Sequence, residues 1–306
     1  MQFLSKKRLG LNCTKMDTLL ELLSYRFFIN AIIAALLASV TCGIIGSYIV
    51  ARRIVFISGG ITHASFGGIG LGYFFGFNPI LGAVFFAVLS ALGIEYMSKK
   101  TDVREDSVIA ILWSLGMAVG IIFVFLTPGY SANLMSFLFG NILTVSTLNI
   151  QLLIALAVII AVVFAAMFKT ILFVAYDEQF ARAMKMPVEK VNYLLITLVA
   201  LTIVLNIRVA GIILVLSLLT IPQTIAGIFT NNFKTIILLS VLIGMAGSFG
   251  GLLASYFFDI PSGAAIIFLL VLIFMIAKII SSIQTSFSIK NQVKQHNENK
   301  NAETQA

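Results

Sequence analysis

The sequence predicts an all-α, polytopic membrane helix bundle, and three observations predict it. Of the 306 residues, 60% are apolar and only 10% are charged, whereas a soluble chain has roughly 25% charged residues. The mean hydropathy is +1.07. The apolar residues gather in stretches long enough to cross a bilayer, and the basic residues lie in the tails and in the short segments between those stretches. We therefore expect a multi-pass protein surrounded by lipid bilayer.

The first crossing follows a polar, basic N-terminal segment, residues 1–27. The apolar run 28–50 is longer than the apolar region of a secretory signal peptide, and no A-x-A cleavage site follows it. We therefore expect this run to remain as a membrane helix. Ser39, Gly43 and Ser47 recur at every fourth position, which predicts a face that lets a neighbouring helix approach closely.

The second crossing, residues 56–73, is the stretch around which we expect the bundle to be organised. It contains His63, the only histidine outside the polar C-terminal tail. An imidazole inside a membrane is costly and therefore indicates function, with a structural hydrogen bond between helices as the alternative. Gly68, Gly72 and Gly76 are spaced four residues apart, so we expect them to form one packing face.

The remaining apolar stretches bring the expected number of full crossings to nine. They are residues 80–96, 107–126, 150–175, 188–206, 209–228, 235–258 and 264–281.

Two further features break the simple alternation of crossings. Residues 134–145 would extend only about 18 Å as a helix, against a hydrocarbon core of about 30 Å, so we expect a short or re-entrant helix there. Pro222 predicts a kink whose freed carbonyl is satisfied by Thr220 or Gln223.

Charge fixes the expected orientation. Arg52, Arg53 and the loop 99–106 should lie on the cytoplasmic side, because basic loops are retained there. An odd number of crossings then places the N-terminus outside. Three carboxylates near cytoplasmic helix ends could form an exit for a transported ion, although ordinary interfacial charges are the favoured interpretation; they are Glu95, Glu105 and Asp106.

A short amphipathic helix is expected between two crossings, on the cytoplasmic side. Its acidic residues come first and its basic residues last, which is the order that a helix dipole favours, and Pro187 ends it. The polar tail 283–306 has the composition of a disordered segment. The expected organisation is thus a head at 1–27, a permease domain at 28–282 and this tail.

The sequence excludes several activities. It contains no G-x-x-x-x-G-K-[ST] loop, no H-E-x-x-H motif and no paired intramembrane carboxylates, which argues against ATP hydrolysis by this chain, a membrane metalloprotease and a carboxylate-rich proton pump. Cys13 and Cys42 are too far apart for a zinc ribbon or a redox pair. The basic residues form no face interleaved with aromatic residues, so we expect no nucleic-acid binding. The remaining features of the sequence are typical of a permeation pathway with a docking surface, and we do not expect an enzyme.

Several motifs, in the same order, resemble those of the membrane permease subunits of the zinc, manganese and iron ABC importers. Two basic residues, Arg52 and Arg53, precede a Thr-His-Ala sequence at 62–64. The other similar segments are 137–143 (FLFGNIL), 181–187 (ARAMKMP), 200–204 (ALTIV), 209–222 (VAGIILVLSLLTIP) and 259–263 (DIPSG). The similarity extends from about Leu20 to Ser282. In the 181–187 segment Lys185 replaces the family's usual glycine.

The resemblance implies a function and a set of partners. The chain would be a homodimeric permease in the bacterial plasma membrane, with two copies of a separate ATPase subunit and an extracytoplasmic metal-binding protein. ATP would bind the partner, and the divalent metal ion would be the cargo, so the chain itself would bind no cofactor. The short cytoplasmic helix would couple to the ATPase through Asp177, Glu178, Phe180, Ala181, Arg182, Ala183, Met184, Met186 and Pro187.

His63 is the metal ligand that the resemblance implies, with Ser58, Thr62 and Ser65 as candidates for the translocation path. Many family members carry an aspartate four residues before the histidine, where this chain has Gly59. One imidazole and hydroxyl groups do not discriminate among zinc, manganese and iron(II). The alternatives are a secondary carrier driven by protons or sodium and a membrane scaffold that does not transport.

Overall fold

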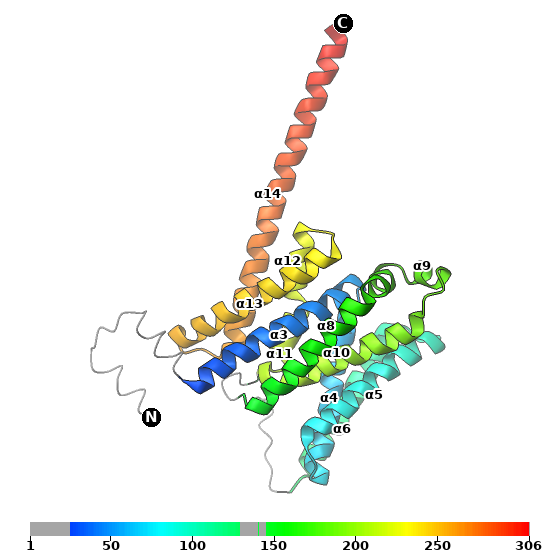
Figure 1. Cartoon of the computed structure of the whole chain (residues 1–306), viewed down its shortest axis with the longest axis vertical. Coiled ribbons are helices and arrows are strands. Elements are labelled where there is room, and N and C mark those ends of the chain that lie inside the picture. The colour runs from blue at the N-terminus through cyan, green and yellow to red at the C-terminus, as the bar shows by residue number, and fades with distance from the viewer. Residues whose placement is uncertain (1–24, 129–139, 141–144, 306) are drawn as a thin grey trace, which may run out of the picture.

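The computed structural model describes residues 25–128, 140 and 145–305. Throughout this part of the chain the regular structure is helical and no strand occurs, so the predicted all-α fold is confirmed (Figure 1). The helices are α3 (Arg26–Ala51), α4 (Val55–Phe75), α5 (Pro79–Lys100), α6 (Glu105–Leu126), α8 (Thr147–Tyr176), α9 (Glu178–Ala183), α10 (Val188–Ala210), α11 (Ile212–Leu218), α12 (Ile221–Phe229), α13 (Phe233–Phe258) and α14 (Ser262–Gln305).

Eight segments of the described chain are long and apolar enough to cross a membrane, with α11 and α12 together forming one of them. The ninth predicted crossing is α4, which has 21 residues and is therefore about 30 Å long. Its glycines, hydroxyl groups and histidine make it less apolar than the other eight. The predicted helix at 134–145 lies outside the described residues except for Gly140 and Val145, and so does nearly all of the head at 1–27.

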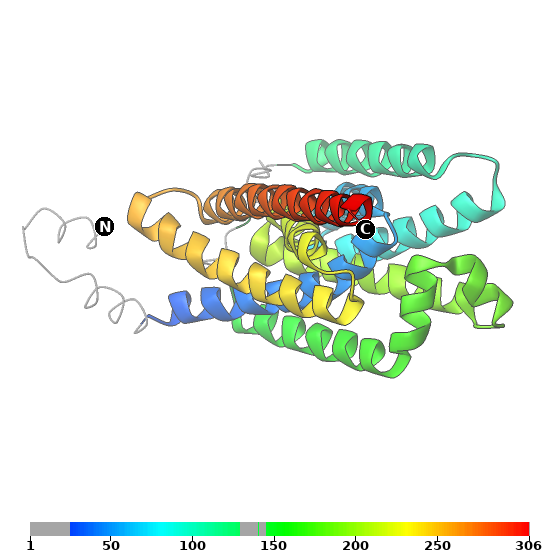
Figure 2. The same cartoon turned by 90° about the horizontal axis from the view of Figure 1, so that it is seen from above.

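The helices place the expected cytoplasmic segments at one end of the bundle. The short helix α9 lies at the opposite end from the start of α3, as both views show (Figures 1 and 2). The ends of α3 and α5 approach α9 through ion pairs that involve Arg52 and Lys99. Three segments predicted to be cytoplasmic therefore meet at the same end of the bundle, which we call the coupling end.

The small residues of α4 hold it between α5 and α6. A Cβ atom added to Gly68 would lie 1.9 Å from the carbonyl oxygen of Gly82 in α5, and one added to Gly70 would lie 2.4 Å from that of Gly120 in α6. These backbones are in direct contact, which only glycine permits. Gly72 likewise packs against Pro79, so two of the three glycines expected on this face do form it.

Gly76 does not belong to that packing face. It ends α4 with a left-handed backbone, φ 74°, and a Cβ added there would meet no atom within 4 Å. Its role is therefore conformational, since glycine adopts a positive φ at no steric cost.

The small-residue face of α3 packs as predicted. A Cβ on Gly43 would lie 2.6 Å from Cγ2 of Val241 in α13, and the Oγ atoms of Ser39 and Ser248 are 3.1 Å apart. Thr41 accepts a hydrogen bond of 3.2 Å from the Asn206 amide of α10. Such contacts join helices inside a membrane, where burial of apolar surface gives little drive for association.

The predicted kink at Pro222 is a complete break between α11 and α12. Proline removes the backbone donor that would reach the carbonyl of Leu218, and the Gln223 side-chain amide donates to this oxygen instead, at 3.0 Å. The same amide donates to the carbonyl of Cys42 in α3, at 2.8 Å. Gln223 thus repairs the break and joins it to the first helix.

Two helix boundaries differ from the prediction. The turn expected at Ile207 and Arg208 lies at Gly211, because α10 continues to Ala210 and Gly211 then takes φ 79°. The tail expected to be disordered continues α14 as a helix to Gln305, projecting from the bundle (Figure 1). Extending an existing helix requires no new nucleation, which polar residues would otherwise have to overcome.

We predict that Gly68→Ala destabilises the protein by about 1–3 kcal/mol or more, because the new methyl group would force α4 and α5 apart. Gly93→Ala is the matched control: its Cβ would lie 3.6 Å from Cδ1 of Leu112, an ordinary contact, and alanine favours the helix. Size-exclusion profiles after heating in detergent measure both. Equal stability of the two variants would contradict the packing described.

Candidate functional site

His63 stacks on the only tryptophan of the chain. The ring centroids of His63 in α4 and Trp113 in α6 are 4.2 Å apart and the ring planes are 5° from parallel. The imidazole is half-buried, and its Nδ1 atom is buried without a hydrogen-bond partner among the described residues. The ring is therefore held in place by an aromatic neighbour, while one nitrogen remains available.

The three hydroxyl candidates lie on another face of α4. Ser58, Thr62 and Ser65 are buried, and each donates to a backbone carbonyl of its own helix: that of Val55 at 2.6 Å, Ser58 at 2.5 Å and Thr62 at 2.6 Å, respectively. At 3.6 residues per turn these side chains point about 100° or more away from His63. The structure therefore does not gather the three hydroxyls around the imidazole.

An open hollow of about 310 Å³ is lined by Trp113 of the stacked pair, whereas His63 itself does not line it. Ser58 and Gly59 of α4 line it together with Trp113, and the break between α11 and α12 contributes Ser217 and Thr220. Each of these hydroxyls donates to its own helix but keeps lone pairs on its oxygen. Of the four predicted site residues, Ser58 thus lines the hollow, whereas His63, Thr62 and Ser65 do not.

The site has no built-in negative charge. In the chain outside the gaps at 1–24, 129–139 and 141–144, no group of three or more His, Cys, Asp or Glu residues could hold a metal ion. A Cβ atom on Gly59 would lie 3.6 Å from the Trp113 ring, so packing does not require glycine there. A neutral site with one imidazole suits brief contact with a passing cation, because conduction requires weak binding.

Specific hydrogen bonds define both ends of helix α9. The Asp177 side chain accepts a hydrogen bond of 2.9 Å from the Phe180 amide, which caps the first turn. At the other end the Lys185 amide donates to Arg182 and the Met186 amide to Ala181, at 3.0 and 3.1 Å. This pair of bonds is a Schellman motif, which requires a left-handed residue after the helix.

Lys185 is that left-handed residue, with φ 57°. A lysine pays a steric cost in this conformation that glycine does not. The geometry therefore explains why glycine is expected at this position, and the lysine changes the local strain while keeping the turn.

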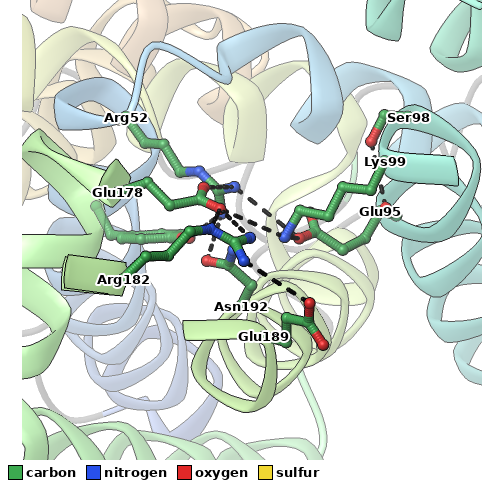
Figure 3. Close-up of polar contacts among 9 residues, drawn as sticks. Arg52, Glu95, Ser98, Lys99, Glu178, Arg182, Glu189 and Asn192 are labelled. Carbon is green, nitrogen blue, oxygen red and sulfur yellow. Dashed lines mark hydrogen bonds and ion pairs between the residues drawn. The ribbon is translucent and has the colours of Figure 1, made fainter. Parts of the chain in front are cut away.

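An ion-pair cluster around Arg52 joins α9 to the bundle (Figure 3). Arg52 Nη1 donates to the Tyr48 hydroxyl at 2.6 Å and to Asn192 Oδ1 at 2.8 Å, and Nη2 donates to Glu178 Oε2 at 3.3 Å. Lys99 pairs with Glu95, and its Nζ lies 3.9 Å from Glu178 Oε1. We call these six residues, with Arg182, the Arg52 cluster.

Glu178 is the junction of the Arg52 cluster. Partial burial disfavours its charged form, but the hydrogen bond from Arg182 and the charges of Lys99 and Arg52 outweigh this and lower the pKa of the carboxyl group. Because the folded pKa is lowered, the stabilisation is present at neutral pH and is lost only as the pH falls through that lowered value. Glu178 therefore stays charged at neutral pH.

Two apolar side chains, Phe180 of α9 and Met184 directly after it, are exposed. Ala181 is fully buried, whereas Phe180 is 45% and Met184 57% exposed. Both lie outside the predicted membrane spans. The helix is therefore fixed to the bundle on one side and presents apolar surface on another.

Residues 24–281 match the ABC 3 transport family. The chain belongs to the ABC 3 transport family. It is 39% identical over 264 residues to the uncharacterized membrane protein slr2045 of Synechocystis, covering 86% of this chain and 94% of that protein. It is 31% identical over 257 residues to the manganese transport system membrane protein MntC of Halalkalibacterium halodurans, with coverages of 84% and 88%.

A solved structure supports the same assignment. This chain superposes on a chain of PsaBC from Streptococcus pneumoniae, which was solved in complex with Fab, with a TM-score of 0.77. The two are 30% identical, and the match covers 86% of this chain and 95% of that chain.

Two features of the candidate site were not predicted from the sequence. Trp113 was not predicted to take part, although the only tryptophan of the chain, two helices after its only intramembrane histidine, was a usable signal. The roles of Tyr48 and Asn192 in the Arg52 cluster had no signal, since the residues are 144 positions apart. Glu95, interpreted from the sequence as an interfacial charge, belongs to this cluster.

We predict that Lys185→Gly slows hydrogen exchange at the amides of residues 185 and 186, because it removes left-handed strain of roughly 1 kcal/mol. Lys190→Gly, inside α10, should instead speed exchange in the first turn of that helix, since glycine disfavours helices. Faster exchange at residues 185 and 186 in Lys185→Gly would refute the assignment of strain.

Proposed function

We propose that this chain is the membrane permease of an ATP-driven importer of divalent metal ions, with manganese as the first candidate cargo. Membership of the ABC 3 transport family gives the transporter class, and the ATPase is a separate subunit. The metal is inferred from relatives named as manganese systems: MntC of H. halodurans and the import permease ScaB of Streptococcus gordonii, which is 32% identical over 253 residues.

The observation that carries the proposal is the anchored helix α9. Its charged side is held by the Arg52 cluster, and its exposed Phe180 and Met184 need a partner to cover them, because apolar surface outside the membrane favours association. We assign this surface to a groove on the ATPase subunit. Movement of the ATPase would then reach the ends of α3, α5 and α10 directly.

We propose two copies of the permease, two ATPase subunits and an extracytoplasmic metal-binding protein in the working complex. The hollow beside His63 is open in one chain, and α6, which forms one wall, exposes large apolar side chains such as Ile111 and Leu115. A second copy across this face would enclose a path between two His63 helices. ATP binding would draw the two α9 helices together and open that path.

His63 is proposed to contact the ion through an imidazole nitrogen as it passes, with Ser58, Thr62 and Ser65 as candidate residues along the path. An imidazole without a carboxylate beside it binds divalent metals of the first transition row without strong selection. A secondary carrier is not favoured: within the described helices the only buried carboxylate is Glu95, which pairs with Lys99 and Arg52 at the coupling end.

The experiment is uptake of labelled manganese, zinc and iron(II) into cells that express the permease with its ATPase and binding protein. We expect one metal to accumulate, only when the ATPase is present. His63→Ala should lower the uptake roughly ten-fold or more, since even residues that only orient metal ligands contribute this much to metal affinity.

Thr197→Val is the matched control, because it removes a half-buried hydroxyl that donates to the Tyr193 carbonyl within α10 and has no proposed role in the path. It should transport nearly as the wild type does. Uptake without the ATPase would overturn the ATP-driven mechanism in favour of a carrier. Normal uptake by a His63→Ala protein would leave the importer in place but remove His63 from the path.

A further inference from the structure

A second, larger hollow lies between α3, α8 and α13 and shares no residue with the one beside His63. Its volume is about 870 Å³. Apolar side chains form most of its wall, including Ile44 of α3, Ala161 and Ala165 of α8 and Ile237 of α13. Lys169, Thr170 and Lys234 supply its polar groups. The hollow therefore combines an apolar channel with two cations.

The two lysines reach this hollow from different helices. α8 is kinked at Met167, where φ is −112° and ψ is 17°, and Lys169 follows the kink. Lys234 of α13 places its Nζ atom 5.2 Å from the centroid of the Phe168 ring. Within the described chain neither lysine forms an ion pair with a carboxylate, so two uncompensated positive charges line one cavity.

The hollow lies near the membrane boundary at the coupling end. The rings of Tyr176 and Phe233 are 5.9 Å apart, which places the start of α13 beside the end of α8. Lys169 precedes Tyr176 by seven residues, or about 10 Å along the helix. A lysine at this depth extends its ammonium group toward the lipid headgroups. In the cytoplasmic leaflet those headgroups include anionic phospholipids.

We propose that this hollow binds one anionic phospholipid of the cytoplasmic leaflet. The lipid phosphate lies between Lys169 and Lys234 and accepts a hydrogen bond from Thr170, while an acyl chain follows the apolar wall between α3 and α8. Charge complementarity selects the headgroup, and the apolar wall distinguishes a lipid from a soluble anion. The bound lipid would brace the kink in α8, the helix that leads directly into α9.

Native mass spectrometry of the purified full-length protein tests the site, with phosphatidylglycerol and phosphatidylcholine of identical acyl chains as probes. Wild type should bind phosphatidylglycerol about thirty-fold more tightly than the variant Lys169→Gln/Lys234→Gln, since each lysine near a membrane surface contributes appreciably to binding of anionic lipid. Lys100→Gln/Lys278→Gln removes two charges elsewhere and should bind as the wild type does.

Ala165→Trp fills the apolar wall, leaves both lysines in place and should also lose the lipid. The proposal fails if phosphatidylcholine binds wild type as well as phosphatidylglycerol does, or if the Lys169/Lys234 variant retains its lipid. It also fails if the control pair loses as much binding as the test pair. Displacement of the lipid by millimolar inorganic phosphate would instead identify a site for soluble anions and overturn the assignment. Size-exclusion profiles establish that each variant is folded.

Discussion

The contact between Arg52 and Glu178 is the interaction on which the coupling end depends. It joins the end of the first membrane helix to the first turn of α9, across 126 positions of sequence. Asn192 and Tyr48 satisfy the remaining face of the guanidinium, and Lys99 balances Glu95. Because hydrogen bonds to charged groups contribute about 1.5–3 kcal/mol each, α9 is held as part of the bundle and not as a loose connection. A partner that moves α9 must therefore move α3, α5 and α10.

Close backbone packing helps to hold α4, with its glycines and polar side chains, inside the bundle. α4 contains glycines, hydroxyl groups and a histidine alongside the buried apolar side chains of Ile57, Ile61, Phe66 and Ile69. At Gly68 and Gly70 its contacts with α5 and α6 are made between backbones, so close packing adds to the burial of those side chains. The same tight packing fixes the register in which Trp113 meets His63. The imidazole is thus held against Trp113, which lines the hollow, and no carboxylate is among the residues that line it.

Much of this arrangement could be predicted from the sequence, because it depends on local patterns. The lengths of the apolar stretches predicted the crossings, and the four-residue spacing of small residues predicted the packing faces of α3 and α4. Pro222 with Gln223 predicted the broken helix. The acidic residues at the start of α9 and the basic residues at its end predicted where this helix lies in the sequence. The stacking of Trp113 and the Arg52 cluster could not be derived in this way, since both depend on the register between distant helices. The left-handed Lys185 and the true turn at Gly211 were also missed, because charge and apolarity say little about backbone handedness.

The most direct test of this account compares ATP hydrolysis with metal uptake in the reconstituted permease and ATPase complex. In Arg52→Gln the complex should still assemble through Phe180 and Met184, while the metal transported per ATP hydrolysed falls, because α9 is no longer fastened to α3. The neighbouring Arg53→Gln removes the same charge outside the Arg52 cluster and should leave the ratio unchanged. If Arg52→Gln transports as much metal per ATP as wild type does, the Arg52 cluster does not transmit the movement of the ATPase and the central claim is wrong.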